Sequence, residues 1–278
     1  MDISTRLSDG GFPAWPLPLD ATCAEFARSI ARALCREFRL PRDVTCDVTL
    51  MASELATNAL LHAYRTTPPG GGRPEMWAYL RRHAGPEIVF KVFDPVTWKG
   101  PLRRPPQSPP TDSAGGRGLH LVDVLTTEHG GRWGVHPTRG RLGASPAPGK
   151  AVFFTVPLPV PLPVPLPVPL PVPLAAPVPL PVPEYAPRLP SERPRPWSRR
   201  RCAERIQALL AARGLRAHLS CDGSLRQERG AWQVWVREEW ISYRLLDGEA
   251  VRLPASDVIE VVERIVRHTE EIPAVCSL

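Results

Sequence analysis

A block of alternating prolines at residues 157–183 constrains the fold more than any other feature of the sequence. It opens with four consecutive Pro-Leu-Pro-Val units, and the chain of 278 residues contains 36 prolines. Proline has no backbone N–H and fixes φ, so this block suits neither a helix interior nor a central strand and favours polyproline II. It therefore predicts a stiff spacer, roughly 80 Å long at about 3.1 Å per residue, between two folding units.

The spacer divides the chain into a longer and a shorter part. We expect a flexible N-terminus over residues 1–14, a first domain over 15–156, a linker over 157–197 and a small α+β domain over 198–278. A second hypothesis for the linker is that its prolines dock into a partner domain that binds proline-rich segments.

The net charge permits an anionic partner but does not require one. The formal charge is +7 at pH 7, yet the arginines are dispersed except in RPRPWSRRR at residues 193–201. We interpret that run as a solvated linker end that leads into a helix. We therefore expect no direct nucleic-acid partner.

Cysteine usage and hydropathy bear on the compartment. The six cysteines form no C-x-x-C pair and no zinc-ligand spacing with the histidines, which favours a reduced, cytoplasmic protein. The N-terminal segment lacks a basic start followed by an apolar core, so we expect no signal peptide. No apolar run of about 18 residues is free of proline, so we also expect no membrane span.

The first domain contains both helical and strand-like patterns. Helices are expected over 21–38, over 43–64 and from just past Gly116, and strands over 75–80, 87–94, 132–135 and 150–156. A polar, proline-rich loop over 95–113 lies between the second strand and the third helix, and loops of this length are usually functional or disordered. This order predicts a mixed sheet with helices on one face.

The part after the linker resembles a small α+β domain of unknown role. We expect a helix closed by Gly214, strands within 217–223, 231–238 and 240–248, and a final helix opened by Ser256. The strands contain Trp232, Trp235 and Trp240. These could form an exposed aromatic platform, but tryptophans in a small domain are more often part of the core.

A glycine cluster marks the start of the third helix of the first domain. Gly115, Gly116 and Gly118 lie where the loop becomes a helix, so free N–H groups and the positive end of the helix dipole converge there. The spacing matches neither G-x-x-x-x-G-K-[ST] nor a full G-x-G-x-x-G after a strand. The cluster therefore predicts either an anion site or simple helix capping.

Three polar side chains could complete a site. Glu54 and Asn58 lie one helical turn apart, so a carboxylate that can accept a hydroxyl proton sits beside an amide oxygen that can ligate Mg²⁺. A polar stripe on an amphipathic helix is the alternative. Asp94 ends a predicted strand, where it could accept a hydrogen bond from an exocyclic amine or simply start a turn.

The order of these motifs resembles the ATP-binding domain of the GHKL family. SELATNALLHA, then VFDP, then the long loop, then GGRGLHLV and GKAVFFTV follow one another over roughly residues 15–156. The similarity is closest to the small anti-sigma-factor serine/threonine kinases of actinobacterial regulators. It implies a histidine-kinase-like ATP-binding domain with a two-layer α/β sandwich, the Bergerat-type fold, and ATP and Mg²⁺ as cofactors.

The resemblance also assigns roles to residues. It implies Glu54 as the catalytic base, Asn58 as the magnesium ligand and Asp94 as the adenine contact. It places the stretch Gly116, Arg117, Gly118 and Leu119 at the phosphates, with backbone amides of the glycines as donors. The sequence departs from the family pattern in two places: residues 94–98 have Val96 and Trp98 at the glycine positions of Asp-x-Gly-x-Gly, and Gly149-Lys150 replaces Gly-Thr.

These observations lead to three hypotheses about function. The first is a regulatory kinase that phosphorylates an antagonist of the anti-anti-sigma type, with sequestration of a sigma factor as an additional role. The second is a catalytically inactive module in which ATP orders the loop over 95–115 and so sets the affinity for a partner. The third is an adaptor that carries the proline-rich arm. A homodimer is compatible with all three.

Overall fold

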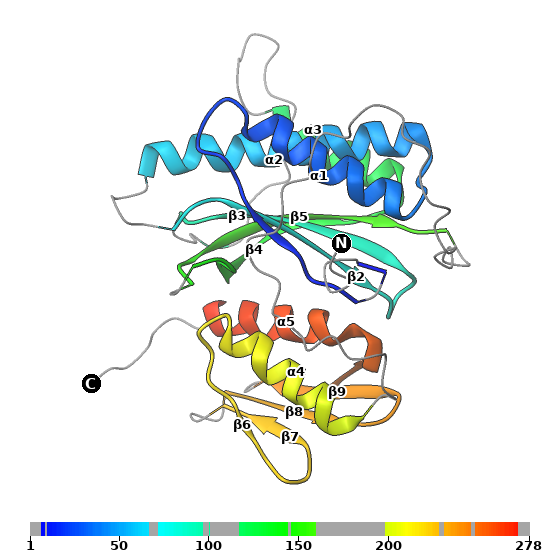
Figure 1. Ribbon diagram of the computed structural model, residues 1–278, viewed down its shortest axis with the longest axis vertical. Coiled ribbons are helices and arrows are strands. Elements are labelled where there is room, and N and C mark those ends of the chain that lie inside the picture. Colours follow the sequence, from blue (N-terminus) through cyan, green and yellow to red (C-terminus); the bar gives the residue numbers. More distant parts are fainter. Residues whose placement is uncertain are drawn as a thin grey trace, which may run out of the picture.

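The computed structural model describes residues 7–8, 10–66, 72–96, 100, 117–143, 146–159, 198–227, 231–245 and 248–271. Most of the proline repeat and of the loop over 95–113 lies outside these residues, as do Gly115 and Gly116, so the expectations for them stay predictions. The described chain forms a larger and a smaller domain, one stacked on the other (Figure 1).

The larger domain is built on a five-stranded antiparallel sheet. Its strands are β1 (Ala14–Pro16), β2 (Glu75–Arg81), β3 (Glu87–Asp94), β4 (Trp133–Arg139) and β5 (Pro148–Pro157). They lie in the order β1-β2-β3-β5-β4, and every neighbouring pair is antiparallel. The prediction of a mixed sheet is therefore wrong. β3 and β4 run in the same direction, but they are not neighbours in the sheet. β5 lies between them and is antiparallel to both.

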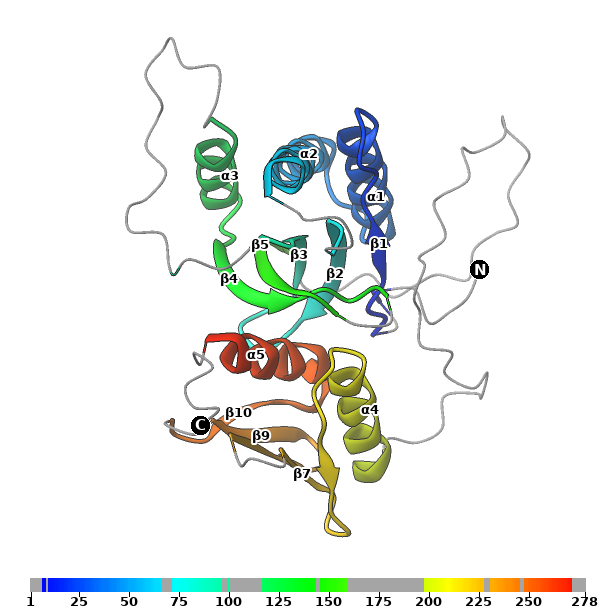
Figure 2. The ribbon, with the colours of Figure 1, turned by 90° about the vertical axis from the view of Figure 1, so that its left-hand side faces the viewer.

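Three helices cover one face of this sheet (Figures 1 and 2). They are α1 (Cys23–Glu37), α2 (Arg42–Thr66) and α3 (Arg117–Glu128), within a few residues of the predicted helices. Met51 and Leu55 of α2 are buried between the layers, where Phe90 stacks on Phe154 with ring centroids 4.9 Å apart. This arrangement is consistent with the expected two-layer α/β sandwich.

The smaller domain packs two helices on one face of a second antiparallel sheet. It comprises α4 (Arg199–Ala211), β6 (His218–Leu219), β7 (Ser224–Arg226), β8 (Trp232–Val236), β9 (Trp240–Leu245), β10 (Val251–Pro254), the 3₁₀ turn η2 (Ala255–Asp257) and α5 (Val258–Glu271). The strand order is β10-β9-β8-β7-β6. The sequence predicted both helices but missed β7 and β10, because strands of three and four residues are too short to show an alternating pattern.

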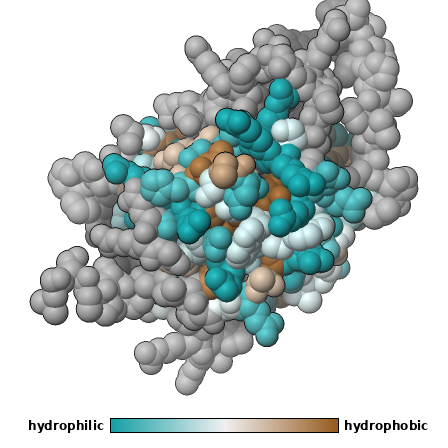
Figure 3. All heavy atoms as spheres, turned by 90° about the horizontal axis from the view of Figure 1, so that it is seen from below, coloured by the Kyte–Doolittle hydropathy of each residue, from teal (hydrophilic) through white to brown (hydrophobic). Residues whose placement is uncertain are grey.

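The tryptophans of the smaller domain divide between its core and its outer face. Trp232 is 1% exposed, which confirms the core interpretation for this residue. Trp235 and Trp240 are half-buried, and the guanidinium groups of Arg244 and Arg252 lie 6.0 and 4.0 Å from their ring centroids. Seen from below, this side of the molecule mixes hydrophilic and hydrophobic residues (Figure 3).

Two findings bear on the expectations from cysteines and hydropathy. The five described cysteines, Cys23, Cys35, Cys46, Cys202 and Cys221, are free thiols. Among the described residues, no helix combines the length and the apolar character that crossing a bilayer requires. The cytoplasmic location stays a prediction.

The two domains share one hydrophobic cluster. α5 lies against the sheet face that the three helices of the larger domain leave open (Figure 2), and Trp77 of β2 belongs to the same cluster as Val262 of α5. Every residue of β2 and β3 is buried, because both faces of these strands are covered. In the segment 1–14, which we expected to be flexible, Leu7, Phe12 and Ala14 are also buried.

Charged groups cross the same interface. Nζ of Lys91 lies 2.8 Å from Oε2 of Glu263, and Nη2 of Arg213 lies 3.1 Å from Oε1 of Glu263. All three side chains are at most 5% exposed. Burial acts to raise the pKa of Glu263, but the charges of Arg213 and Lys91 outweigh it and lower the pKa to about 2. An ionised carboxylate therefore joins the smaller domain to β3.

Replacement of Glu263 by Gln is expected to lower the free energy of unfolding by about 3–5 kcal/mol, because two buried cations lose their counter-charge. The matched change Glu271→Gln removes an exposed pair with Arg267, and its cost should stay below about 1 kcal/mol. Urea denaturation followed by tryptophan fluorescence measures both values. Equal losses in the two variants would contradict the buried ion cluster.

The same carboxylate predicts a pH dependence of stability. The pKa of Glu263 in the folded chain, about 2, is below its ordinary value of 4.5, so its contribution is complete above about pH 4.5 and is lost as the pH falls through about 2. The stability difference between wild type and Glu263→Gln should therefore shrink on acidification. A difference that stays constant from pH 7 to pH 2 would contradict this assignment.

Candidate functional site

Glu54 and Asn58 lie one turn apart on the side of α2 that faces α3. Both side chains are half-buried, while Met51 and Leu55 of the same helix point into the core. No hydrogen bond or ion pair from the described part of the chain engages either Glu54 or Asn58. The helical period of α2 thus directs apolar residues to the sheet and leaves this carboxylate and amide available to a ligand.

The first turn of α3 lies directly over this pair. A Cβ atom added to Gly118 would lie 2.7 Å from Oε2 of Glu54 and 3.2 Å from Nδ2 of Asn58. The shorter distance is below any ordinary Cβ contact, so glycine allows the two helices to approach this closely. Three predicted residues therefore meet beside the N-terminal end of α3, where backbone N–H groups carry partial positive charge.

The rest of the predicted glycine motif is described only in part. α3 begins at Arg117, whose side chain lies outside the described residues, as does the whole of Gly116. Leu119 is half-buried and packs against the core between helices and sheet. The Leu119 side chain therefore contributes to the core, and its backbone N–H is the group that could contact a ligand at the start of the helix.

Asp94 is present at the end of β3 but is already engaged. It is 2% exposed, and its Oδ1 accepts a hydrogen bond of 3.0 Å from the backbone N–H of Val96, which is the turn-starting role. Its Oδ2 lies 2.9 Å from Nδ1 of His62 and 3.3 Å from Nζ of Lys150. The adenine contact implied by the resemblance would have to compete with these two groups.

His62 and Lys150 are the residues that the sequence analysis did not assign. His62 lies eight residues after Glu54, so its place on the same helix face was a usable signal. Lys150 faces Asp94 because the two residues are partners in the β3–β5 register. That register depends on the insertion of β5 beside β3, which the sequence did not predict.

Glu54, Asn58 and His62 lie along one face of α2, so the groups beneath Gly118 and the groups around Asp94 are reached from the same side of this helix. The eight residues from Glu54 to His62 correspond to about 12 Å at a rise of 1.5 Å per residue. An elongated ligand would therefore place an anionic end beneath Gly118 and a polar ring beside Asp94.

The residues beneath Gly118 fit a magnesium ion that is shared with a phosphate. Mg²⁺ usually keeps several waters and takes only one or two protein oxygens besides those of a phosphate. The Asn58 amide and the Glu54 carboxylate can supply such ligands. Among the described residues, no group of three or more His, Cys, Asp or Glu side chains could hold a metal by itself.

Comparison with known proteins agrees with this geometry. Residues 17–136 match the family model of the histidine kinase-like ATPase domain, a span that includes Glu54, Asn58, Asp94 and Gly118 but not Lys150. No curated protein matches the chain. This region is therefore similar to a histidine kinase-like ATPase domain, and ATP is the ligand that the similarity indicates.

Proposed function

We propose that the chain is an ATP-dependent protein serine/threonine kinase of the anti-sigma-factor type, which regulates an antagonist protein by phosphorylation. One observation carries the proposal: Glu54 and Asn58 lie beneath Gly118, at the N-terminal end of α3, and no other described residue engages their side chains by a hydrogen bond or ion pair. A base, a metal ligand and backbone donors for phosphate are thus within reach of one another.

Each residue has a chemical task in this proposal. Phosphoryl transfer depends mainly on positioning and on neutralising charge, which bound Mg²⁺ would supply for the phosphates. Asn58 would hold the metal, and the backbone amides of Gly116 and Gly118 would hold phosphate oxygens. Glu54 accepts the proton of the partner's serine or threonine hydroxyl, which makes that oxygen a better nucleophile.

A second candidate function is a nucleotide-sensing module that binds its partner without phosphate transfer. The observation in its favour is the engagement of Asp94 by His62 and Lys150, because this opposes close contact with the adenine amine. In that case the nucleotide sets the affinity for the partner protein, an antagonist or a sigma factor. The adaptor, which needs no nucleotide at all, is the third candidate.

Replacement of Glu54 by Gln is expected to abolish phosphate transfer while leaving ATP affinity within about threefold, because the base is lost but the shape is kept. The exposed Glu128→Gln change in α3 is the matched control. The measurement is the transfer of label from ATP, labelled in its γ-phosphate, to serine and threonine residues of proteins from the source organism. Calorimetric titration with Mg²⁺–ATP gives the affinity. Equal labelling by Glu54→Gln and wild type would refute the kinase, and ATP binding without any labelling would select the sensing module.

Replacement of Gly118 by Ala is expected to weaken ATP binding by about tenfold or more, because the new methyl group displaces the Glu54 carboxylate and separates α3 from α2. Gly248→Ala is the matched control, since a Cβ there meets nothing within 4 Å. Calorimetry on both variants tests this, with circular dichroism to check folding. Unchanged ATP affinity in folded Gly118→Ala would place the nucleotide elsewhere.

Replacement of Lys150 by Ala is expected to strengthen ATP binding by about fivefold and to increase the preference for ATP over GTP, because Oδ2 of Asp94 loses its cationic partner and keeps only His62 as a competitor of the adenine amine. The exposed Arg42→Ala change removes the same charge far from Asp94 and should have no effect. Titration with both nucleotides measures the preference. A loss of affinity instead would mean that Lys150 itself contacts the nucleotide.

A further inference from the structure

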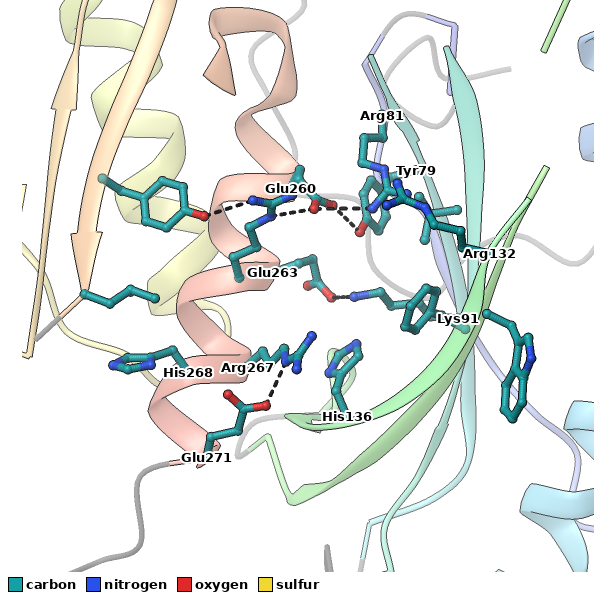
Figure 4. Close-up of a pocket in the computed structure, with 16 residues that line it drawn as sticks. Tyr79, Arg81, Lys91, Arg132, His136, Glu260, Glu263, Arg267, His268 and Glu271 are labelled. Atoms are coloured by element: carbon teal, nitrogen blue, oxygen red, sulfur yellow. Dashed lines mark hydrogen bonds and ion pairs between the residues drawn. The ribbon is translucent and has the colours of Figure 1, made fainter. Parts of the chain in front are cut away.

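A cleft of about 470 Å³ lies between the two domains, on the sheet face opposite Glu54 and Asn58. Figure 4 shows α5 along one wall and the strands of the larger domain along the other. The volume is in the range of about 300–1,000 Å³ that is usual for small-molecule sites. Because the sheet separates this cleft from the candidate nucleotide site, the two can be occupied independently.

The carboxylates deep in the cleft are fully used by the protein itself. Glu263 pairs with Lys91, and Glu260 accepts hydrogen bonds from Tyr79 at 2.8 Å and from Nε of Arg264 at 2.7 Å. Arg264 is used in turn, since its two terminal nitrogens lie 3.1 Å from the Tyr243 hydroxyl and 3.3 Å from a ring nitrogen of His83. These groups hold the domains together and leave no free carboxylate there for a cationic ligand.

Two arginines at the opening of the cleft have N–H donors that no other described residue engages. Arg267 uses Nε for a 2.8 Å bond to Glu271, and its side chain is 50% exposed. Arg132 makes a long contact of 3.5 Å with Glu87, and its side chain is 61% exposed. A guanidinium group has five N–H donors in a planar fork, so the unused edge of Arg267 can bind an oxyanion through two hydrogen bonds.

His136 adds a buried acceptor opposite Arg267. Its side chain is 3% exposed, its Nδ1 donates to the carbonyl oxygen of Pro137 at 2.8 Å, and burial followed by the charge of Lys91 lowers its pKa to about 3. The ring is therefore neutral, and Nε2 carries a lone pair. No hydrogen bond from the described residues reaches Nε2. Figure 4 shows Arg267 and His136 pointing toward one another across the cleft.

The wall near His136 is aromatic. Phe153 lies with its ring centroid 5.7 Å from that of His136, whereas the Trp133 ring turns to the helical face of the sheet, where its indole N–H donates a 2.6 Å hydrogen bond to Asp123 of α3. Phe153 lines the cleft. A planar or small organic group can therefore pack between the guanidinium group of Arg267 and Nε2 of His136 without leaving a buried polar group unpaired.

We propose that this cleft binds a small organic anion, one that carries a carboxylate or phosphate group together with a hydroxyl or amine donor. Arg267 holds the oxyanion, His136 accepts the hydrogen bond of the donor group, and Phe153 packs against the remainder. Because both domains contribute to the site, the ligand stabilises their docked arrangement in proportion to its affinity and concentration. The smaller domain thereby acquires a role as half of an effector site.

Calorimetric titration of the full chain with 4-hydroxybenzoate and with glycerol 3-phosphate tests the proposal, and 4-hydroxybenzamide and glycerol serve as neutral counterparts. At least one anion should bind with a saturable isotherm while its neutral counterpart does not. The exposed change Arg267→Gln should weaken that binding by about tenfold or more. The matched change Arg201→Gln, an exposed arginine on α4, should leave it unchanged.

A second variant tests the acceptor. His136→Phe keeps a planar ring of similar size but removes Nε2, so it should weaken the binding of the same anion. The melting temperature of the variant should stay within a few degrees of that of the wild type. Titration of each variant with ATP shows separately whether the nucleotide site is intact. The proposal is overturned if neither anion saturates, if the neutral counterparts bind equally well, or if Arg267→Gln has no effect. Unchanged affinity in folded His136→Phe would overturn the assignment of His136.

Discussion

The architecture depends on the burial of both faces of β3. One face carries Phe90 and Val92 into the core beneath the helices, and the other carries Lys91 toward α5. A buried ammonium group needs a counter-charge, because its desolvation costs several kcal/mol or more when it is unpaired. Glu263 supplies that charge and Arg213 shares it. The need to pair Lys91 therefore fixes where α5 can lie, and with it the position of the whole smaller domain.

This sandwich arrangement places two candidate sites on opposite faces of one sheet. The candidate nucleotide site lies within the helical layer, between α2 and the start of α3, whereas the cleft lies between the sheet and α5. β3 contributes to both, since Asp94 at its end faces His62 on α2 and Lys91 three residues earlier faces Glu263. A shift of α5 along the sheet would disturb the Lys91 pair first, so any coupling between the sites has β3 as its shortest physical route.

The sequence predicted what depends on local spacing and missed what depends on strand pairing. The Glu54–Asn58 pair and the glycine-opened helix are local features that spacing alone predicts, whereas their meeting in one site was implied by the family resemblance. The antiparallel order was missed, because nothing local indicates that β5 returns between β3 and β4. The Asp94–Lys150 pair follows from that same register. Lys91 within the apolar run EIVFKVFD was the one local sign that a charged partner covers this face.

The two ends of the candidate nucleotide site differ in how they would gain binding energy. At the phosphate end, the described residues leave Glu54 and Asn58 without competing partners. At the other end, Asp94 is nearly buried and holds the cation of Lys150, and hydrogen bonds assisted by charge are about twice as strong as neutral ones. The neutral amine of adenine would have to share or displace that bond. A nucleotide bound here would therefore gain more affinity from contacts to its phosphates and their metal than from contacts to its base, and such a site would select weakly between adenine and guanine.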